Sequence, residues 1–232
     1  MTGVVRLLLI SIVLIVGAEQ RASAQSDGPG LRPNHLTVSA GLIVSGGYPI
    51  GDRNAEIRRN ASGPPAPFTL FRAESTFGRS NGLDARVGIA LSRVWAIEVG
   101  GTYARPELAV TISQDTESTE PVRLAERISQ YTVDVSGVFQ FTRLALGARA
   151  RPYATVGAGY LRQLHEDRLL AETGRLYHVG GGLRYWLHGG FARSRALGVR
   201  GEARYVYRSG GVDFEDRSRG YPVLSVLGFA GF

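Results

Sequence analysis

Two runs of alternating apolar and polar residues, placed back to back in residues 82–103, constrain the fold of this chain most strongly. A period of two is what a β-strand produces, because successive side chains point to opposite faces. The connection at 92–94 has three residues, so the same face stays apolar on both sides of it. That face carries no charge and consists of Leu83, Ala85, Val87, Ile89, Leu91, Trp95, Ile97, Val99, Gly101 and Tyr103. We predict a β-hairpin with one apolar and one polar face.

The same alternation recurs in six further segments, which gives eight predicted strands in all. They cover residues 36–46, 82–91, 95–103, 128–141, 152–161, 177–185, 197–207 and 223–232. The connections after strands two, four and six are shorter than the others, which is typical of bacterial outer-membrane barrels. We predict that the segment 48–81, with four prolines and many arginines, is a long irregular loop. We predict a second polar loop at 104–127, in which 107–112 could prolong the third strand.

The first residues have the features of a secretory signal peptide. Arg6 precedes the apolar run 7–16, and Ala22-Ser23-Ala24 forms a cleavage site of the A-x-A type. We expect residues 1–24 to be a signal peptide, 25–34 a periplasmic lead-in and 35–232 one barrel domain. The chain contains no cysteine, so neither a disulfide nor a thiolate metal site can stabilise that domain.

Aromatic residues on the apolar faces gather at two heights, which distinguishes a membrane barrel from a soluble one. When successive strands are given opposite directions, one group of aromatic residues falls at the short-turn rim: Trp95, Phe139, Phe141, Tyr185 and Phe232. The other group falls at the long-loop rim: Tyr103, Tyr131, Tyr160, Tyr177, Tyr205 and Tyr207. Aromatic girdles on both sides of an apolar band mark the two membrane interfaces. We therefore predict an all-β, eight-stranded, antiparallel up-and-down transmembrane β-barrel.

The polar faces carry equal numbers of opposite charges. The acids are Asp84, Glu98, Asp134 and Glu202, and the bases are Arg86, Arg184, Arg200 and Arg204. Side chains fill the interior of an eight-stranded barrel, where an unpaired charge is costly. We expect these residues to form a charge network in the lumen, together with His178, which lies within possible reach of Asp84. On the last strand, Leu227 and Phe229 fall on the lumen face.

These strands, the cleavage site and the C-terminal LSVLGFAGF resemble the small eight-stranded barrels of the bacterial outer membrane, of the OmpA/OmpX type and their OmpW-like relatives. The resemblance implies export to the outer membrane. It also implies that Phe232 belongs to the signal that the outer-membrane assembly machinery reads. Two functions remain open: a structural or surface-interaction protein, and an OmpW-like conduit for small hydrophobic solutes.

A third alternative, a lipid-A-modifying enzyme, needs a histidine with a nearby serine and carboxylate. No such motif surrounds His35, His165, His178 or His188, so we expect no enzyme. Acidic residues at 115–120 and 213–216 lack the spacing of a calcium loop, and we expect no metal and no cofactor. Arginine supplies all 27 basic residues and is scattered along the chain, which argues against a nucleic-acid partner. We expect a monomer whose partners are outer-membrane lipid, lipopolysaccharide and the assembly machinery.

Overall fold

The computed structural model describes residues 33–57, 68–115, 120–144, 146, 149–165, 170–188, 196–213 and 217–232. The predicted signal peptide and most of the lead-in lie outside these residues. No helix in the described part of the chain combines the length and the hydropathy needed to cross a membrane.

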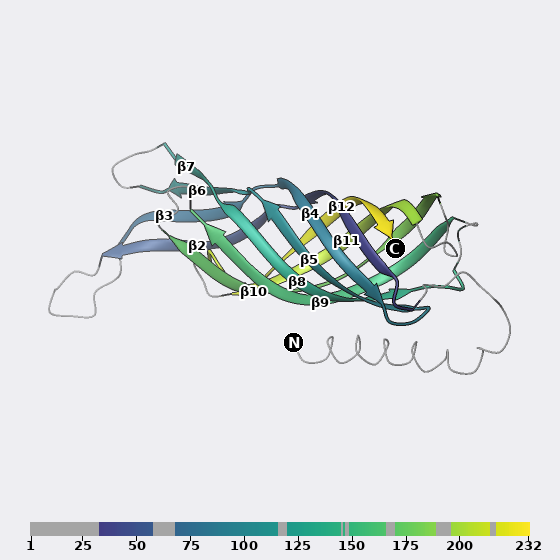
Figure 1. Ribbon diagram of the computed structural model, residues 1–232. Coiled ribbons are helices and arrows are strands. Elements are labelled where there is room, and N and C mark those ends of the chain that lie inside the picture. The colour runs from purple at the N-terminus through teal and green to yellow at the C-terminus, as the bar shows by residue number, and fades with distance from the viewer. Residues whose placement is uncertain are drawn as a thin grey trace.

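Eight antiparallel strands close into a barrel, which confirms the predicted fold (Figure 1). Around the barrel the order is β1-β12-β11-β10-β9-β8-β5-β4, so the first and last strands pair and no barrel edge stays open. Phe232 completes this closure, because its backbone N–H donates to the carbonyl of Leu36 at 2.9 Å. The strands are β1 (Leu36–Ser45), β4 (Ser80–Ala90), β5 (Trp95–Ala104), β8 (Ser129–Gln140), β9 (Ala150–Leu164), β10 (Ala171–His188), β11 (Ala196–Gly210) and β12 (Arg219–Gly231).

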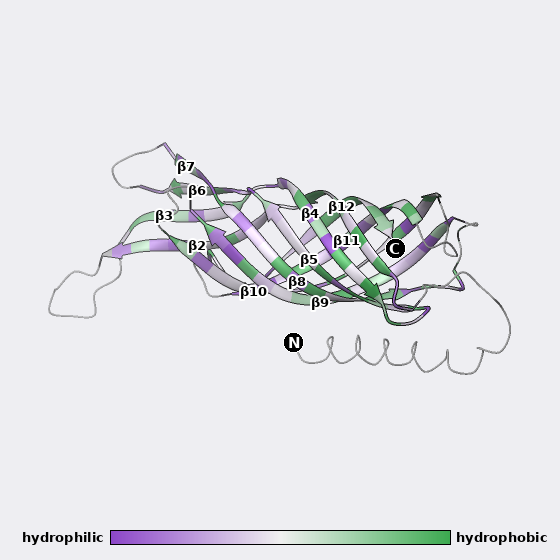
Figure 2. Ribbon diagram, viewed as in Figure 1, coloured by the Kyte–Doolittle hydropathy of each residue, from purple (hydrophilic) through white to green (hydrophobic). Residues whose placement is uncertain are grey.

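The barrel is apolar outside and polar in the middle of its interior. Along β8, Val135 is 53% exposed and its neighbour Ser136 is 1% exposed. Figure 2 shows hydrophobic residues alternating with polar ones along the barrel strands. A soluble barrel would bury its apolar face, so this arrangement matches a wall that faces lipid. Leu227 and Phe229 of β12 are buried in the interior as the alternation predicts, whereas Leu224 and Val226 face outward.

A second sheet extends the barrel at its long-loop end (Figure 1). Its order is β2-β3-β6-β7, with the strands β2 (Tyr48–Ile57), β3 (Phe68–Phe77), β6 (Glu107–Ser113) and β7 (Val122–Arg127). Each strand continues one of the barrel strands β1, β4, β5 and β8 after a break of one or two residues. We call this sheet the extension.

The prediction that 48–81 is an irregular loop is wrong, because β2 and β3 of the extension lie within this segment. Proline at the start of a strand is compatible with a sheet, and the register of β2 against β3 shifts between Pro49 and Gly51. This irregularity lets the strand continue past the proline. The loops predicted at 162–175 and 208–222 are also shorter than expected, because β9, β10, β11 and β12 all extend farther at this end. The possible continuation at 107–112 is present as β6.

Apolar side chains fill the two ends of the interior. At the outer end, where the extension joins the barrel, thirteen buried residues form one cluster: Ile43, Tyr48, Ile50, Phe77, Ala104, Leu108, Ile128, Leu161, Leu176, Val206, Val212, Tyr221 and Val223. At the short-turn end, two smaller clusters consist of Ala90, Ala96, Val138 and Tyr153, and of Trp186, Ala196 and Phe229. The polar residues of the lumen therefore lie between two apolar layers.

Candidate functional site: the charge network of the lumen

Eight charged side chains in the middle of the lumen form one continuous chain of alternating sign. Asp134 binds Arg86 at 3.1 Å, and Arg86 binds Asp84 at 3.1 Å. Asp84 also binds Arg204, which binds Glu202 at 2.6 Å. From there the chain continues through Arg200, Glu98 and Arg184. All eight residues are buried, and their formal charges sum to zero.

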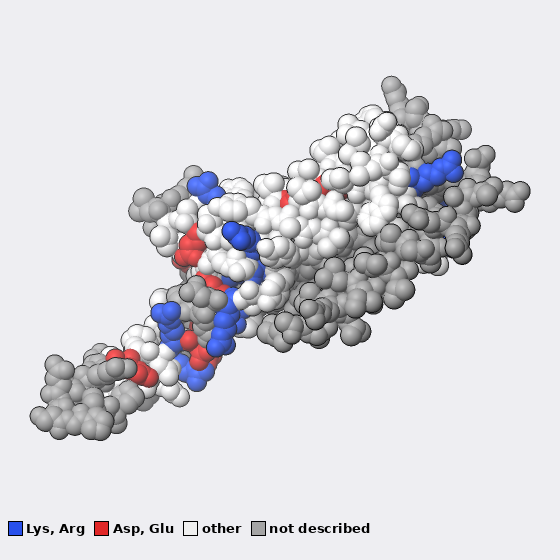
Figure 3. All heavy atoms as spheres, turned by 90° about the horizontal axis from the view of Figure 1, so that it is seen from below, with Lys and Arg blue, Asp and Glu red and all other residues white. Residues whose placement is uncertain are grey.

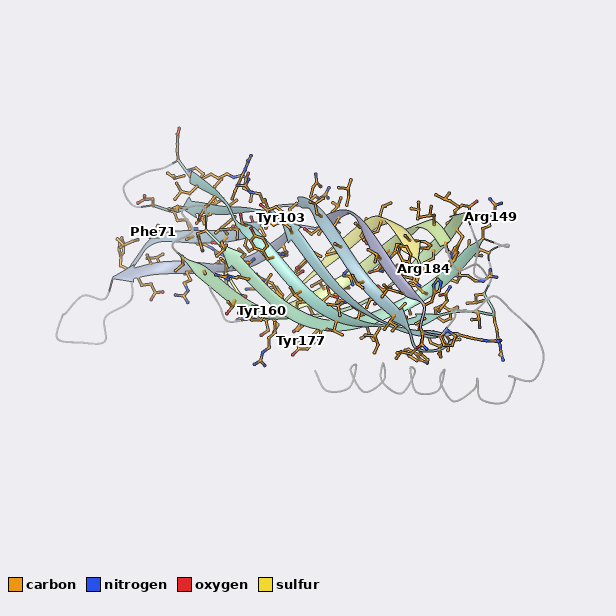
Figure 4. All side chains as sticks on the ribbon, in the orientation of Figure 1. Phe71, Tyr103, Arg149, Tyr160, Tyr177 and Arg184 are labelled. Carbon is orange, nitrogen blue, oxygen red and sulfur yellow. The ribbon has the colours of Figure 1, made fainter. Side chains whose placement is uncertain are left out.

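Four of the seven ion pairs join different strands, and the other three join residues two apart on one strand. Arg200 lies on β11 and Glu98 on β5, which stand opposite each other in the barrel order. The guanidinium of Arg200 also donates to Glu202 at 2.7 Å, two residues away on its own strand. Arg184 lies inside the barrel (Figure 4) and donates to the same carboxylate of Glu98. The ion pairs between different strands brace the barrel, and the side chains of the network together fill its bore.

His178 joins this network at Asp134, not at Asp84. Its Nε2 atom lies 3.2 Å from Asp134 Oδ2 and 3.2 Å from Ser136 Oγ, and Ser136 donates to Asp134 at 2.7 Å. The expected partner Asp84 is instead enclosed by Arg86 and Arg204. The sequence left this choice open, because the faces of β4 and β8 both turn toward His178.

This contact does not have the geometry of a hydrolase triad. In such a triad the histidine uses one ring nitrogen for the serine and the other for the carboxylate. Here Ser136 and Asp134 both approach Nε2, and the buried Nδ1 has no hydrogen-bond partner among the described residues. Of the other histidines, His165 contacts Glu126 at 3.0 Å, while the side chain of His188 lies outside the described part.

Sequence reasoning missed several interior residues. Tyr153 lies under Arg184 and Arg200, with its ring centroid 5.1 Å and 5.4 Å from their guanidinium carbons, and it donates to Glu202. Arg208 lies over Tyr48, 5.0 Å from the ring centroid, and donates to Gln163 at 3.1 Å. The alternation 200, 202, 204, 206, 208 could have identified Arg208, had the strand been extended that far. Nothing local in the sequence places Tyr48 in the same cluster as Arg208.

The predicted girdle residues lie on the outer surface of the wall. Tyr131, Tyr160, Tyr177, Tyr185, Tyr205, Tyr207 and Phe232 are exposed, and Trp95, Tyr103, Phe139 and Phe141 are partly exposed. Neighbouring strands bring pairs together: the ring centroids of Trp95 and Phe139 are 5.0 Å apart, and so are those of Tyr103 and Tyr131. Tyr160 and Tyr177 project from the wall at the end nearer the extension, and Arg149 marks the opposite end (Figure 4).

Charged side chains outside the lumen gather on the extension and at the ends of the barrel, and the wall between them is almost free of charge on the face shown in Figure 3.

The acidic segments 115–120 and 213–216 lie partly outside the described residues. Within the described part of the chain, no group of three or more metal-ligating side chains comes together. Asp213 lies 3.6 Å from Arg219.

Comparison with known proteins identifies the fold. No family model matches the sequence, and no curated protein does. Among solved structures, the outer membrane protein OprG from Pseudomonas aeruginosa matches with a TM-score of 0.50 and 11% identity, over 88% of this chain and 98% of that one.

Two further barrels match less closely. Ail, the attachment invasion locus protein of Yersinia pestis, has a TM-score of 0.40 and 14% identity, over 86% and 98% of the two chains. The outer membrane protein AlkL has a TM-score of 0.38 and 16% identity, over 92% and 97%. With an apolar wall outside and charges inside, the chain has the fold of a small eight-stranded barrel of the bacterial outer membrane.

Proposed function

We propose that this protein is a closed outer-membrane barrel of structural or surface-interaction type, with a lumen that does not conduct ions. The observation that carries the proposal is the unbroken chain of alternating charges from Asp134 to Arg184. A water-filled pore would leave charged side chains hydrated along its walls, whereas these are buried against one another. The apolar clusters above and below the network support the same conclusion.

The extension is the part that would meet the outside, since it continues the barrel at its long-loop end. Its surface carries ion pairs between exposed side chains, among them Arg72 with Asp52 at 2.8 Å and Arg72 with Glu74 at 3.2 Å. A polar hollow of about 290 Å³ lies between these residues and the start of β12. Exposed loops and extensions on a rigid scaffold are where binding functions concentrate.

Planar-bilayer recording tests the closed lumen. Folded protein should give no steady single-channel current, while a general porin in the same bilayer serves as the conducting control. A reproducible current from protein with the heat-modifiable gel migration of a folded barrel would overturn the proposal.

A conduit for small hydrophobic solutes is the second candidate, and one feature favours it. A groove of about 740 Å³ runs along the lipid-facing side of β1, β4, β5 and β8. Its floor includes the small residues Ala40, Ala85 and Gly101, and Tyr103 and Tyr131 stand at its outer end. The hydrocarbon chain of an apolar solute would fit in this groove, over the small residues and below the two tyrosines.

Uptake of an alkane from water into protein-containing vesicles separates the two candidates. A conduit would accelerate uptake, and Gly101→Leu would slow it by filling the groove. Gly201→Leu is the matched control, because a Cβ added at Gly201 meets no atom within 4 Å and the residue lies on the opposite strand β11. The closed-barrel proposal instead expects the same uptake with and without protein.

A further inference from the structure

Two arginines on the outer surface of the barrel stand just beyond the tyrosines of the outer rim. Arg162 follows Tyr160 by two residues in β9, and Arg175 precedes Tyr177 by two residues in β10. β9 runs toward the extension and β10 runs away from it, so both arginines lie on the water side of their tyrosines. Alternate residues share a face, and each arginine is therefore about 7 Å farther along the same lipid-facing stripe.

The strand register brings these four side chains together. Arg162 lies opposite Thr173 on β10 and opposite Tyr131 on β8. Arg175 lies opposite Tyr160 on β9. The two arginines are therefore diagonal neighbours on one surface, with Cα atoms about 7–8 Å apart. Side chains as long as arginine can both reach a single anion from such positions.

The charges at this level of the barrel are separated between the two faces. Glu126 and Glu172 turn to the interior side, where His165 lies 3.0 Å from the first and 4.0 Å from the second. On the outer face, the direct cross-strand neighbours of the two arginines are Thr173, Tyr131, Tyr160 and Ser209, none of which is acidic. Arg162 and Arg175 are exposed and make no ion pair with another residue that the structure describes.

The geometry points to a phosphate-binding site for an outer-leaflet lipid: Arg162 and Arg175 together bind a phosphomonoester of a lipopolysaccharide headgroup. The tyrosines mark the level at which the hydrocarbon meets the headgroups, and the arginines lie where the phosphates begin. A phosphomonoester carries close to two negative charges, which matches two guanidinium groups better than the single charge of a phosphodiester. Arginine also offers paired N–H groups that fit phosphate oxygens. The inference goes beyond the proposed function, because it does not depend on whether the lumen conducts.

Native mass spectrometry of the full chain in detergent micelles tests this site. The probes are lipid A with both phosphates and lipid A from which the phosphates have been removed. The variant R162Q/R175Q should bind phosphorylated lipid A about twenty-five-fold more weakly, at roughly fivefold for each basic residue near an anionic surface. R162K/R175K keeps both charges and should lose less than the glutamine variant. Dephosphorylated lipid A should bind the native chain and both variants equally.

The matched control is R93Q/R143Q, which removes two exposed arginines from the short-turn rim. It should bind phosphorylated lipid A within about twofold of the native chain, and heat-modifiable migration checks that every variant is folded. Equal binding of phosphorylated lipid A by the native chain and R162Q/R175Q would overturn the inference. So would an equal loss with the dephosphorylated lipid or with the control variant.

Discussion

Arg200 donates through one guanidinium nitrogen to both carboxylate oxygens of Glu98, at 2.9 Å each, across the full width of the barrel. The two residues are 102 positions apart in the sequence and come from opposite strands. Glu98 also accepts from Arg184, so one carboxylate binds two buried arginines. Glu98 therefore connects Arg184 to the rest of the network.

Replacing Glu98 with glutamine should destabilise the barrel by about 3 kcal/mol, because the buried Arg184 loses its carboxylate partner and Arg200 keeps only Glu202. The free energy of unfolding in urea, measured in lipid vesicles, gives the magnitude. Glu74→Gln is the control: that carboxylate pairs with Arg72 on the exposed extension, and its loss should cost less than about 1 kcal/mol. Equal losses for the two variants would contradict a network that braces the lumen.

Because one side of the barrel wall faces lipid, the cost of adding a charge should depend on where it is placed. Val135→Arg places a charge on the lipid-facing side of β8 and should cost roughly 2–4 kcal/mol if it lies near the bilayer midplane. Val122→Arg makes the same change at an exposed position of β7 in the extension and should cost less than about 0.5 kcal/mol. Unfolding in lipid measures both. A lower cost at Val135 than at Val122 would show that the wall does not face hydrocarbon.

Two glycines test how tightly the interior is packed. A Cβ added at Gly182 would lie 2.2 Å from the carbonyl oxygen of Gly201 and 2.7 Å from the hydroxyl of Tyr153. Gly182→Ala should therefore destabilise the barrel by about 1–3 kcal/mol. Gly201→Ala points into open space and should be neutral, or stabilising by up to about 1 kcal/mol. Comparing their unfolding free energies tests this difference, and equal values would mean that the lumen has room to spare.

Tyr48 predicts a pH dependence at alkaline pH. Burial raises the pKa of Tyr48 above its ordinary value, although the nearby Arg208 opposes the shift. A raised folded-state pKa means that Tyr48 contributes stability below the unfolded pKa of about 10, and that this contribution is lost as pH rises toward the folded value. Native protein should thus lose stability above pH 10 more steeply than Tyr48→Phe.

Absorbance at 295 nm and urea unfolding at pH 9, 10 and 11 follow this effect. At neutral pH the phenylalanine variant should differ by less than about 1 kcal/mol, because the Tyr48 hydroxyl has no hydrogen-bond partner among the described residues. Parallel stability curves for native protein and variant would show that Tyr48 is not buried in solution.

The extension shows where sequence reasoning stopped. The alternation of β5 and β8 is long and regular, whereas β2 contains Pro49 and Arg53, β3 contains Arg72, and their pairing has two register shifts. A period of two is therefore hard to recognise in these two strands. β2 continues β1, and β3 continues β4. Because β1 and β4 are paired in the barrel, β2 and β3 only have to extend the same ladder of hydrogen bonds. Since the barrel supplies this template, β2 and β3 need little alternation of apolar and polar residues in their own sequence.

The side-chain pattern of each strand determined which residues face lipid and which face the bore, because alternation is a local property of an extended backbone. It did not determine that His178 would meet Asp134, or that Glu98 would lie between Arg184 and Arg200. Those contacts depend on the stagger with which eight strands close, and this is a property of the whole ring. Only the tertiary structure decides the height of each charge in the lumen, and therefore its partner.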